Sequence, residues 1–237
     1  MFFYKVPEKS RQTKQNKKGV DLILRQRKVK NVEERIADHH QYMIENPKGK
    51  KGKWQQVFKN DNPIYAEFGS GKGKFIITMA EQNPGRNYIA VEYRESIILR
   101  VLEKAKEMDF NNIVVLYEHI IDVNEYFDKN ELSGIYLNFS DPWPKNRHAK
   151  RRLTNVKYLE GYKRILKPGC CVEVKTDRDD LFAYTVDEFK KTDMKVLELT
   201  GDLHSTDLEA RLVTTEYEDR FHGGGKKINY CKMQVHG

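Results

Sequence analysis

A glycine-rich stretch flanked by two acidic residues is the first feature of this sequence that could do chemistry. Gly69-Ser70-Gly71-Lys72-Gly73 follows the apolar run 64–68 and precedes a helix-like pattern. A glycine turn between a strand and a helix lets backbone N–H groups approach a ligand closely, so Gly69 and Gly71 are candidate cofactor-binding positions. The spacing GxGxG differs from the dinucleotide fingerprint GxGxxG and from the phosphate loop GxxxxGK[ST]. The loop alone therefore does not identify its ligand.

Two carboxylates beside the loop narrow the choice of ligand. Glu92 ends the next apolar run, 87–92, where an acidic residue can accept hydrogen bonds from both ribose hydroxyls of a nucleoside cofactor. That feature suits NAD and S-adenosylmethionine equally. Glu67 stands just before the loop, where it would attract a cationic methionine end and repel a pyrophosphate. The pair of carboxylates therefore favours S-adenosylmethionine as the cofactor.

A second candidate site follows the apolar run 135–139. Asp141 opens the stretch Asp-Pro-Trp-Pro, and the ligand crevice of an open α/β sheet lies at the carboxyl ends of its strands. We therefore expect Asp141 to lie beside the cofactor and to be catalytic, as a carboxylate that orients the reacting partners. Five cations follow within eight residues. A cluster of this kind can be a solvated surface loop, but its place beside such a crevice favours contacts with phosphate groups. These cations are Lys145, Arg147, Lys150, Arg151 and Arg152.

Charge is distributed unevenly along the 237 residues. The formal net charge is +8, and residues 1–30 alone carry ten Lys and Arg against two Asp and Glu. We expect 1–30 to be a flexible basic extension and 31–237 to form one domain. A basic arm is typical of nucleic-acid-binding proteins, although a tail kept for solubility has the same composition. The arm therefore favours an RNA partner without establishing one.

Several classes of protein are disfavoured by composition. No apolar run approaches the roughly 20 residues that a membrane span needs, and the N-terminus lacks the pattern of a signal peptide. Three Cys make neither a disulfide framework nor a CxxC pair, and His39-His40 has no partner ligands nearby. We therefore expect a cytoplasmic protein without membrane or metal, acting as a monomer or a homodimer.

Short apolar runs alternate with helix-length amphipathic stretches from residue 64 onward. The pattern predicts strands at 64–68, 87–92, 113–117, 135–139 and 170–175, and helices at 75–82, 97–108, 158–166 and 181–189. A further helix is expected within 31–45, and two antiparallel edge strands at 196–199 and 228–235. Such alternation predicts an α/β fold with a mostly parallel sheet and helices on both faces.

Four motifs together resemble the bacterial tRNA (guanine-N7-)-methyltransferase family. They are GSGKG preceded by Glu67, SDPWPKNRHAKRRL at 140–153, KTD at 175–177 and TEYEDRF at 215–221. The resemblance covers roughly residues 50–236. It implies a Rossmann-like, seven-stranded class I methyltransferase fold that uses S-adenosylmethionine. It also implies methylation of a guanine at N7 in the variable loop of tRNA.

The resemblance also implies which residues do the work. Cofactor positions carried over from the family are Glu67, Glu92, His119 and Asp141, and substrate positions are Lys145, Asp177, Thr215, Glu216, Tyr217 and Glu218. RNA contacts are expected from the remaining cations of the basic loop, Arg147, Lys150, Arg151 and Arg152. Trp143 and Tyr217 are candidates to stack on a splayed-out base, or to pack in the core.

One cofactor position departs from the family pattern. His119 stands where the family usually has Asp, so either its ring accepts one hydrogen bond from adenine or only its backbone makes contact. The third interpretation is that His119 does not contact a ligand at all. Two other functions stay open: an RNA-binding protein without activity on a methyltransferase scaffold, and an NAD-type oxidoreductase.

Overall fold

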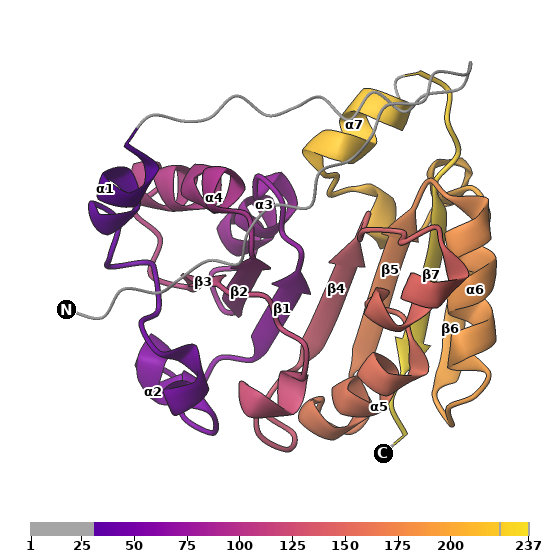
Figure 1. Ribbon diagram of the computed structural model, residues 1–237, viewed down its shortest axis with the longest axis horizontal. Coiled ribbons are helices and arrows are strands. Elements are labelled where there is room, and N and C mark those ends of the chain that lie inside the picture. Colours follow the sequence, from indigo (N-terminus) through magenta and orange to yellow (C-terminus); the bar gives the residue numbers. More distant parts are fainter. Residues whose placement is uncertain (1–30, 223, 237) are drawn as a thin grey trace.

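Seven strands form one sheet in the part of the chain that the structure, a computed structural model, describes: residues 31–222 and 224–236. The basic extension expected at residues 1–30 lies outside the described residues. The strand order is β3-β2-β1-β4-β5-β7-β6 (Figure 1). The strands are β1 (Ile64–Phe68), β2 (Asn87–Glu92), β3 (Ile113–Tyr117), β4 (Gly134–Asn138), β5 (Cys171–Thr176), β6 (Lys195–Thr200) and β7 (Asn229–Gln234).

The order of the strands reverses between β1 and β4, and this reversal positions the site. β1 pairs in parallel with β2 on one side and with β4 on the other. In open α/β sheets a ligand crevice forms at the carboxyl ends of the strands where the order reverses. β7 lies between β5 and β6 and runs antiparallel to both, so β6 has the same direction as β5. Of the two antiparallel edge strands expected from the sequence, only β7 is antiparallel to the rest of the sheet and only β6 lies at its edge.

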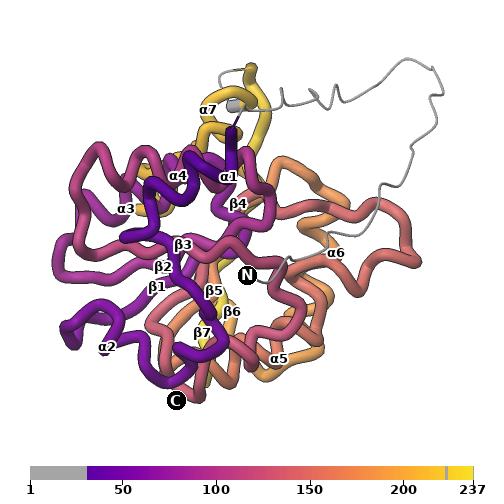
Figure 2. Tube along the Cα trace, turned by 60° about the vertical axis from the view of Figure 1, so that its left-hand side comes forward, coloured from indigo at the N-terminus to yellow at the C-terminus, as the bar shows by residue number. Residues whose placement is uncertain are grey.

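Helices cover both faces of the sheet, as the sequence pattern predicts. Alternate strand residues face opposite sides: Ile89 packs in a cluster with α2, α5 and α6, and Tyr88 and Ala90 pack with α1, α3 and α4. Figure 2 shows α2 and α5 toward the end of the molecule opposite α7. The helices are α1 (Val32–Ala37), α2 (Trp54–Phe58), α3 (Lys74–Gln82), α4 (Glu95–Glu107), α5 (Val156–Ile165), α6 (Asp179–Phe189) and α7 (Glu216–His222).

Short 3-10 helices connect these elements, and one predicted helix is shorter than expected. They are η1 (Pro47–Lys50), η2 (Val123–Glu125), η3 (Asn146–Arg151), η4 (Leu203–Ser205) and η5 (Glu209–Arg211). The helix expected within 31–45 ends at Ala37, because Tyr42 and Ile44 exchange backbone hydrogen bonds with Val115 of β3. No helix of the described residues is long and apolar enough to cross a membrane.

Candidate active site

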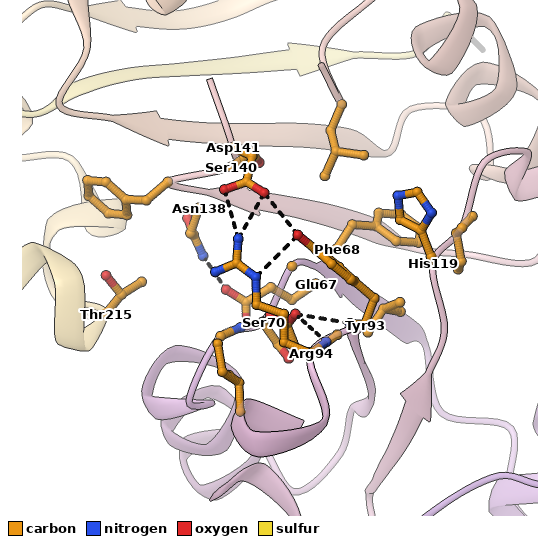
Figure 3. A pocket seen from close by; sticks show the side chains of 18 of the residues that line it. Glu67, Phe68, Ser70, Tyr93, Arg94, His119, Asn138, Ser140, Asp141 and Thr215 are labelled. Carbon is orange, nitrogen blue, oxygen red and sulfur yellow. Dashed lines mark hydrogen bonds and ion pairs between the residues drawn. The ribbon is translucent and has the colours of Figure 1, made fainter. Parts of the chain in front are cut away.

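A pocket of about 520 Å³ lies at the carboxyl ends of β1, β2 and β4 and reaches α7. Its lining includes most of the positions that the sequence singled out. Figure 3 shows His119 and Thr215 on opposite sides of a central pair, Arg94 and Asp141. The pocket therefore has a side next to His119 and a side next to α7. The predicted site residues that line it are Glu67, Gly69, Gly71, Glu92, His119, Asp141, Arg151, Thr215, Glu216 and Tyr217.

The glycine loop has the backbone that only glycine adopts readily. Gly69 has φ = 81° and Gly71 has φ = 56°, and a Cβ atom at either position would meet nothing within 4 Å. The glycines are therefore required by conformation, and their backbone is open to a ligand. Glu92 anchors this loop, because its carboxylate accepts hydrogen bonds from the N–H groups of Gly71 (3.2 Å), Tyr93 (3.0 Å) and Arg94 (2.9 Å). Burial raises the pKa of Glu92.

Glu67 is the most unusual group in the pocket. Its side chain is almost fully buried at the end of β1, and one carboxyl oxygen accepts a hydrogen bond of 2.8 Å from Asn138 Nδ2. The other oxygen is buried and has no hydrogen-bond partner among the described residues. Burial raises the pKa of Glu67 to about 8. An unpaired buried carboxyl oxygen is costly, and a cationic ligand group would satisfy it.

Asp141 lies where the loop after β4 meets the loop after β2. Its carboxylate accepts hydrogen bonds from Arg94 Nη2 at 3.1 and 3.3 Å and from the Tyr93 hydroxyl at 3.3 Å (Figure 3). The Tyr93 ring lies 5.1 Å from the ring of His119, centroid to centroid. Tyr93 and Arg94 directly follow Glu92, so the carboxylate that anchors the glycine loop also supports the residues that hold Asp141.

The loop that carries Asp141 is held in a strained conformation. Phe139 (φ = 50°) and Trp143 (φ = 41°) have left-handed backbones on either side of it, which is costly for residues with a Cβ atom. Arg152 secures the loop: its guanidinium donates to the carbonyl oxygens of Pro142 (2.9 Å) and Trp143 (3.1 Å) and lies 4.2 Å from the centre of the Tyr184 ring.

The placement of Arg152 argues against one expectation from the sequence. Arg152 is buried with its donors engaged inside the loop, so it is poorly placed to contact RNA phosphates. Lys145, Arg147, Lys150 and Arg151 are exposed, and only Arg151 of these four lines the pocket. The guanidinium of Arg151 lies 4.9 Å from the centre of the Trp143 ring. The exposed part of the basic loop, not its buried arginine, is therefore available to an anionic partner.

The first turn of α7 is a capping box, and this changes the interpretation of Thr215 and Glu218. The N–H of Glu218 donates to Thr215 Oγ1 (2.9 Å), and the N–H of Thr215 donates to the Glu218 carboxylate (3.4 Å). In such a box the two side chains satisfy each other's backbone groups at the helix start. The pattern Thr-x-x-Glu at 215–218 is a known signature of this motif, so the sequence contained the signal. Glu218 is fully buried and does not line the pocket, which disfavours direct contact with a substrate.

The two residues between the capping pair face the pocket. Glu216 accepts hydrogen bonds from Lys104 Nζ (2.6 Å) and from the N–H of Lys74, the first residue of α3 (3.3 Å). The Tyr217 ring lies 4.9 Å from the ring of Phe139 and 4.3 Å from that of Phe221, centroid to centroid and tilted against both. Tyr217 is still 42% exposed, so its stacking on a base stays a prediction.

Asp177 lies just outside the pocket lining. Its carboxylate is bound by the Tyr217 hydroxyl (3.3 Å) and pairs with Lys226. Asp177 therefore reaches the pocket through Tyr217, a residue that lines it. No cluster of three or more potential metal-ligating side chains occurs within residues 31–222 and 224–236.

Comparison with known proteins settles the family. A family model described as putative methyltransferase matches residues 61–231. The tRNA (guanine-N(7)-)-methyltransferase of Oceanobacillus iheyensis is 46% identical over 88% of this chain and 98% of its own length. The enzyme of the same name from Clostridioides difficile is 43% identical over 89% of this chain and 99% of its own length. The chain belongs to the tRNA (guanine-N7-)-methyltransferase family.

Solved structures show the same fold at low sequence identity. A structure titled as an antibiotic-related methyltransferase has a TM-score of 0.59 at 15% identity and covers 82% of this chain and 96% of its own. The 16S rRNA methyltransferase KamB has a TM-score of 0.59 at 14% identity, over 78% of this chain and 94% of its own. The predicted class I methyltransferase fold, with its seven-stranded and mostly parallel sheet, is confirmed.

Proposed function

We propose that this methyltransferase transfers a methyl group from S-adenosylmethionine to N7 of a guanine in the variable loop of tRNA. Membership of the family supports the reaction and its substrate. The observation in the structure that carries the proposal is the shared pocket. It contains the buried carboxyl of Glu67, the carboxylate of Asp141 and the exposed guanidinium of Arg151. A cationic cofactor, a reacting base and a phosphate backbone can therefore meet at one place.

The residues of the pocket fit S-adenosylmethionine. The unpartnered oxygen of Glu67 suits the cationic methionine end, and the open backbone of the glycine loop lies beside it. The N–H groups of Gly69 and Gly71 donate to Val91 and Glu92, so this loop offers the cofactor a close approach. Glu92 suits the ribose hydroxyls, and His119 lies on the side that would receive adenine. A pyrophosphate would meet the carboxyl of Glu67 instead of a cation, which argues against the NAD-type oxidoreductase.

The chemistry places few demands on proton transfer. S-adenosylmethionine supplies an electrophilic methyl group on a cationic sulfur. Guanine N7 has an in-plane lone pair and no proton, so the new C–N bond forms as the S–C bond breaks and no general base is needed. The base becomes cationic as the sulfur becomes neutral, and Asp141 is placed to orient the base and stabilise that charge.

Asp141 is held in the structure by Arg94, and this pair bears on its catalytic role. The guanidinium and the Tyr93 hydroxyl fix the orientation of the carboxylate before a substrate arrives. Preorganised groups of this kind lower the cost of reorganisation during the reaction. Asp141 is therefore the orienting carboxylate, and Tyr93 and Arg94 position it.

The partner surface and the cellular setting complete the proposal. Four exposed cations in and just before η3 lie beside the pocket and suit tRNA phosphates: Lys145, Arg147, Lys150 and Arg151. Cys170, Cys171 and Cys231 are free thiols, which suits the reducing cytoplasm in which we place the reaction. The protein would act there as a monomer or a homodimer, without a metal ion.

Transfer of a labelled methyl group tests the proposed function. The protein is incubated with S-adenosylmethionine labelled in the methyl group and with unmodified tRNA, and the tRNA is digested to nucleosides. The label is expected in 7-methylguanosine. Binding of tRNA without transfer would favour a non-catalytic RNA-binding protein, and label in another nucleoside would refute the assignment of N7.

A further inference from the structure

Three ionisable side chains form a buried cluster behind α7, away from the pocket lining. Lys175 at the end of β5 and Glu218 of α7 are 3% and 0% exposed, and Lys175 Nζ donates to a Glu218 carboxyl oxygen at 3.3 Å. The other oxygen of Glu218 lies 2.8 Å from His204 Nε2 in η4, whose side chain is 14% exposed. Three elements far apart in the sequence therefore converge on one carboxylate.

Burying an ionic cluster costs free energy, so its contribution to stability alone does not explain its presence. Taking charges out of water often costs more than the ion pair returns, and apolar residues of similar size are often as stable. Burial lowers the pKa of Lys175, and Glu218 opposes that shift. The groups that also act on the ammonium are Glu173 of the same strand and Glu67 of β1, with the ring of Phe75 at 5.6 Å. Glu218 is its closest carboxylate and the one it donates to.

The cluster fixes the start of α7 from three directions. Lys175 Nζ also donates to the carbonyl oxygen of Val213 at 2.8 Å, two residues before the helix cap. Glu218 completes the capping box with Thr215. The position and the direction of the first turn of α7 are therefore tied to the end of β5 and to η4.

That first turn links the two sides of the pocket. Glu216, one residue after the cap, is held by Lys104, and Lys104 Nζ also donates to the carbonyl oxygen of Lys72 in the glycine loop at 2.9 Å. Tyr217, the next residue, bonds Asp177. A displacement of α7 would therefore move Glu216, which is linked to the glycine loop through Lys104, and Tyr217, which is bonded to Asp177.

We propose that Lys175 and His204 are positioning residues that act through Glu218 to hold α7 at the pocket, and that Glu218 does not itself contact the guanine. This inference rests on the proposed function. It assigns the substrate-facing role in the segment 215–218 to Glu216 and Tyr217. The role of Glu218, with Thr215 as its capping partner, is to start the helix that presents them, and Thr215 also lines the pocket.

Charge-removing variants separate positioning from direct contact. Lys175→Met leaves Glu218 without its cation, Glu218→Gln keeps a residue that can complete a capping box, and the double variant removes both halves of the ion pair. Each is compared with the wild type for melting temperature, affinity for S-adenosylhomocysteine, and KM and kcat with tRNA. The matched control is Lys190→Met, which removes an exposed lysine at the C-cap of α6 that pairs with Asp187.

If the cluster positions α7, the effects of the single substitutions on melting temperature and KM should not add up in the double variant. Lys175→Met is expected to lower the melting temperature by about 5–10 °C and to raise KM for tRNA by about tenfold, with cofactor affinity changed less than about twofold. The double variant is expected to recover most of both losses, because no uncompensated buried charge remains. His204→Phe should raise KM for tRNA in the same direction, and Lys190→Met should resemble the wild type.

Direct contact of Glu218 with guanine predicts the opposite pattern. Glu218→Gln and the double variant would then lose activity equally while Lys175→Met lost less, and this result would overturn the proposal. If Lys175→Met does not fold, the double variant still tests the proposal. A folded double variant with the KM of the wild type supports positioning. A folded double variant with the same defect as Glu218→Gln refutes positioning. Failure of the wild type to methylate tRNA would refute the proposed function instead, while the melting temperatures would still test the cluster.

Discussion

The two sides of the pocket use charge in different ways. On the cofactor side, Glu67 and Glu92 are buried at strand ends, and their partners are backbone N–H groups and the amide of Asn138. On the substrate side, Arg151 lines the pocket, and Arg147 and Lys150 are exposed next to it on the 3-10 helix η3, with Lys145 exposed just before that helix. A few buried charges in fixed positions suit a small cationic ligand, whereas exposed cations suit a long polyanion whose counterions are released on binding.

Because of this contrast, we expect ligand binding at the two sides to respond differently to pH and to salt. The pKa of a buried carboxyl is shifted, so cofactor binding should depend on pH. Exposed cations are screened by salt, so RNA binding should depend on ionic strength. Asp141, half-exposed and paired with Arg94, lies between the two sides and is the residue that we propose for the chemical step.

The largest expected effect is at Asp141. Asp141→Ala should lower methyl transfer at saturating cofactor and tRNA by at least about 100-fold, the scale of losing one preorganised electrostatic group. Single-turnover kinetics measure the chemical step directly. Binding of S-adenosylhomocysteine should change by much less than turnover. Turnover close to that of the wild type would remove Asp141 from the mechanism.

Next in size is the effect of Glu67 on cofactor binding. With a pKa of about 8, Glu67 is largely protonated in the free protein at pH 6.5 and ionised at pH 9, and the cationic cofactor favours the ionised form. Affinity for S-adenosylmethionine should therefore rise by about tenfold between pH 6.5 and 8 and fall again at higher pH, where the α-ammonium group of the cofactor loses its proton. Calorimetry across this range measures it. Glu67→Gln should bind about tenfold more weakly at pH 8 and lose the rise below that pH.

The same carboxyl links pH to the free energy of unfolding. Its folded pKa of about 8 lies above the reference value of 4.5, so between these values the folded state holds a proton that the unfolded state has released. The contribution of Glu67 to stability is therefore greatest below pH 4.5 and is lost as the pH rises toward 8. Melting temperatures of Glu67→Gln should fall less steeply over this window than those of the wild type. Parallel curves would show that Glu67 does not titrate there.

Arg152 and Arg151 are neighbours with opposite expected defects. Arg152→Ala removes the donors to the carbonyl oxygens of Pro142 and Trp143, so the strained loop beneath Asp141 should loosen. We expect a melting temperature lower by about 5 °C and kcat reduced several-fold. The salt dependence of tRNA binding should remain as in the wild type. A reduced salt slope without a loss of stability would instead make Arg152 an RNA contact.

Arg151→Ala should give the smallest change and the clearest salt signature. The side chain is exposed at the pocket, so stability and cofactor affinity should be unaffected. The slope of log K for tRNA against log salt should fall by up to about 0.9 for a lost duplex phosphate contact. Binding titrations at several salt concentrations measure this slope. An unchanged slope would leave Arg151 as a partner of Trp143 only.

The sequence predicted the bounds of β1 and β2 better than those of β4, β5 and α1. Buried strands are recognised in a sequence by their apolar runs, and β1 and β2 begin and end where expected. The positions of Glu67 and Glu92 near the ends of these two strands follow from those runs. β4 and β5 are displaced by about one residue, and α1 stops early because Tyr42 pairs with β3. That pairing is a tertiary contact, which local periodicity does not contain.

Partners that meet only through the fold were missed. Asn138 reaches Glu67 because β4 lies beside β1, and Arg94 reaches Asp141 because the loops after β2 and β4 converge. A polar Asn within an apolar run was a signal for the first pair. The inward position of Arg152 was missed for a similar reason, since a run of cations does not reveal which of them points inward.

The position of the methyl group on tRNA tests the central claim most directly. A guanine methylated at N7 carries a positive charge, and its weakened ring allows the RNA chain to be cleaved selectively at that nucleotide. After reaction with S-adenosylmethionine, an unmodified tRNA should be cleaved at one guanine of the variable loop, and the product of Asp141→Ala should be cleaved at least about 100-fold less. Methylation of another atom, of guanines outside that loop, or of none at all would contradict the function proposed for this pocket.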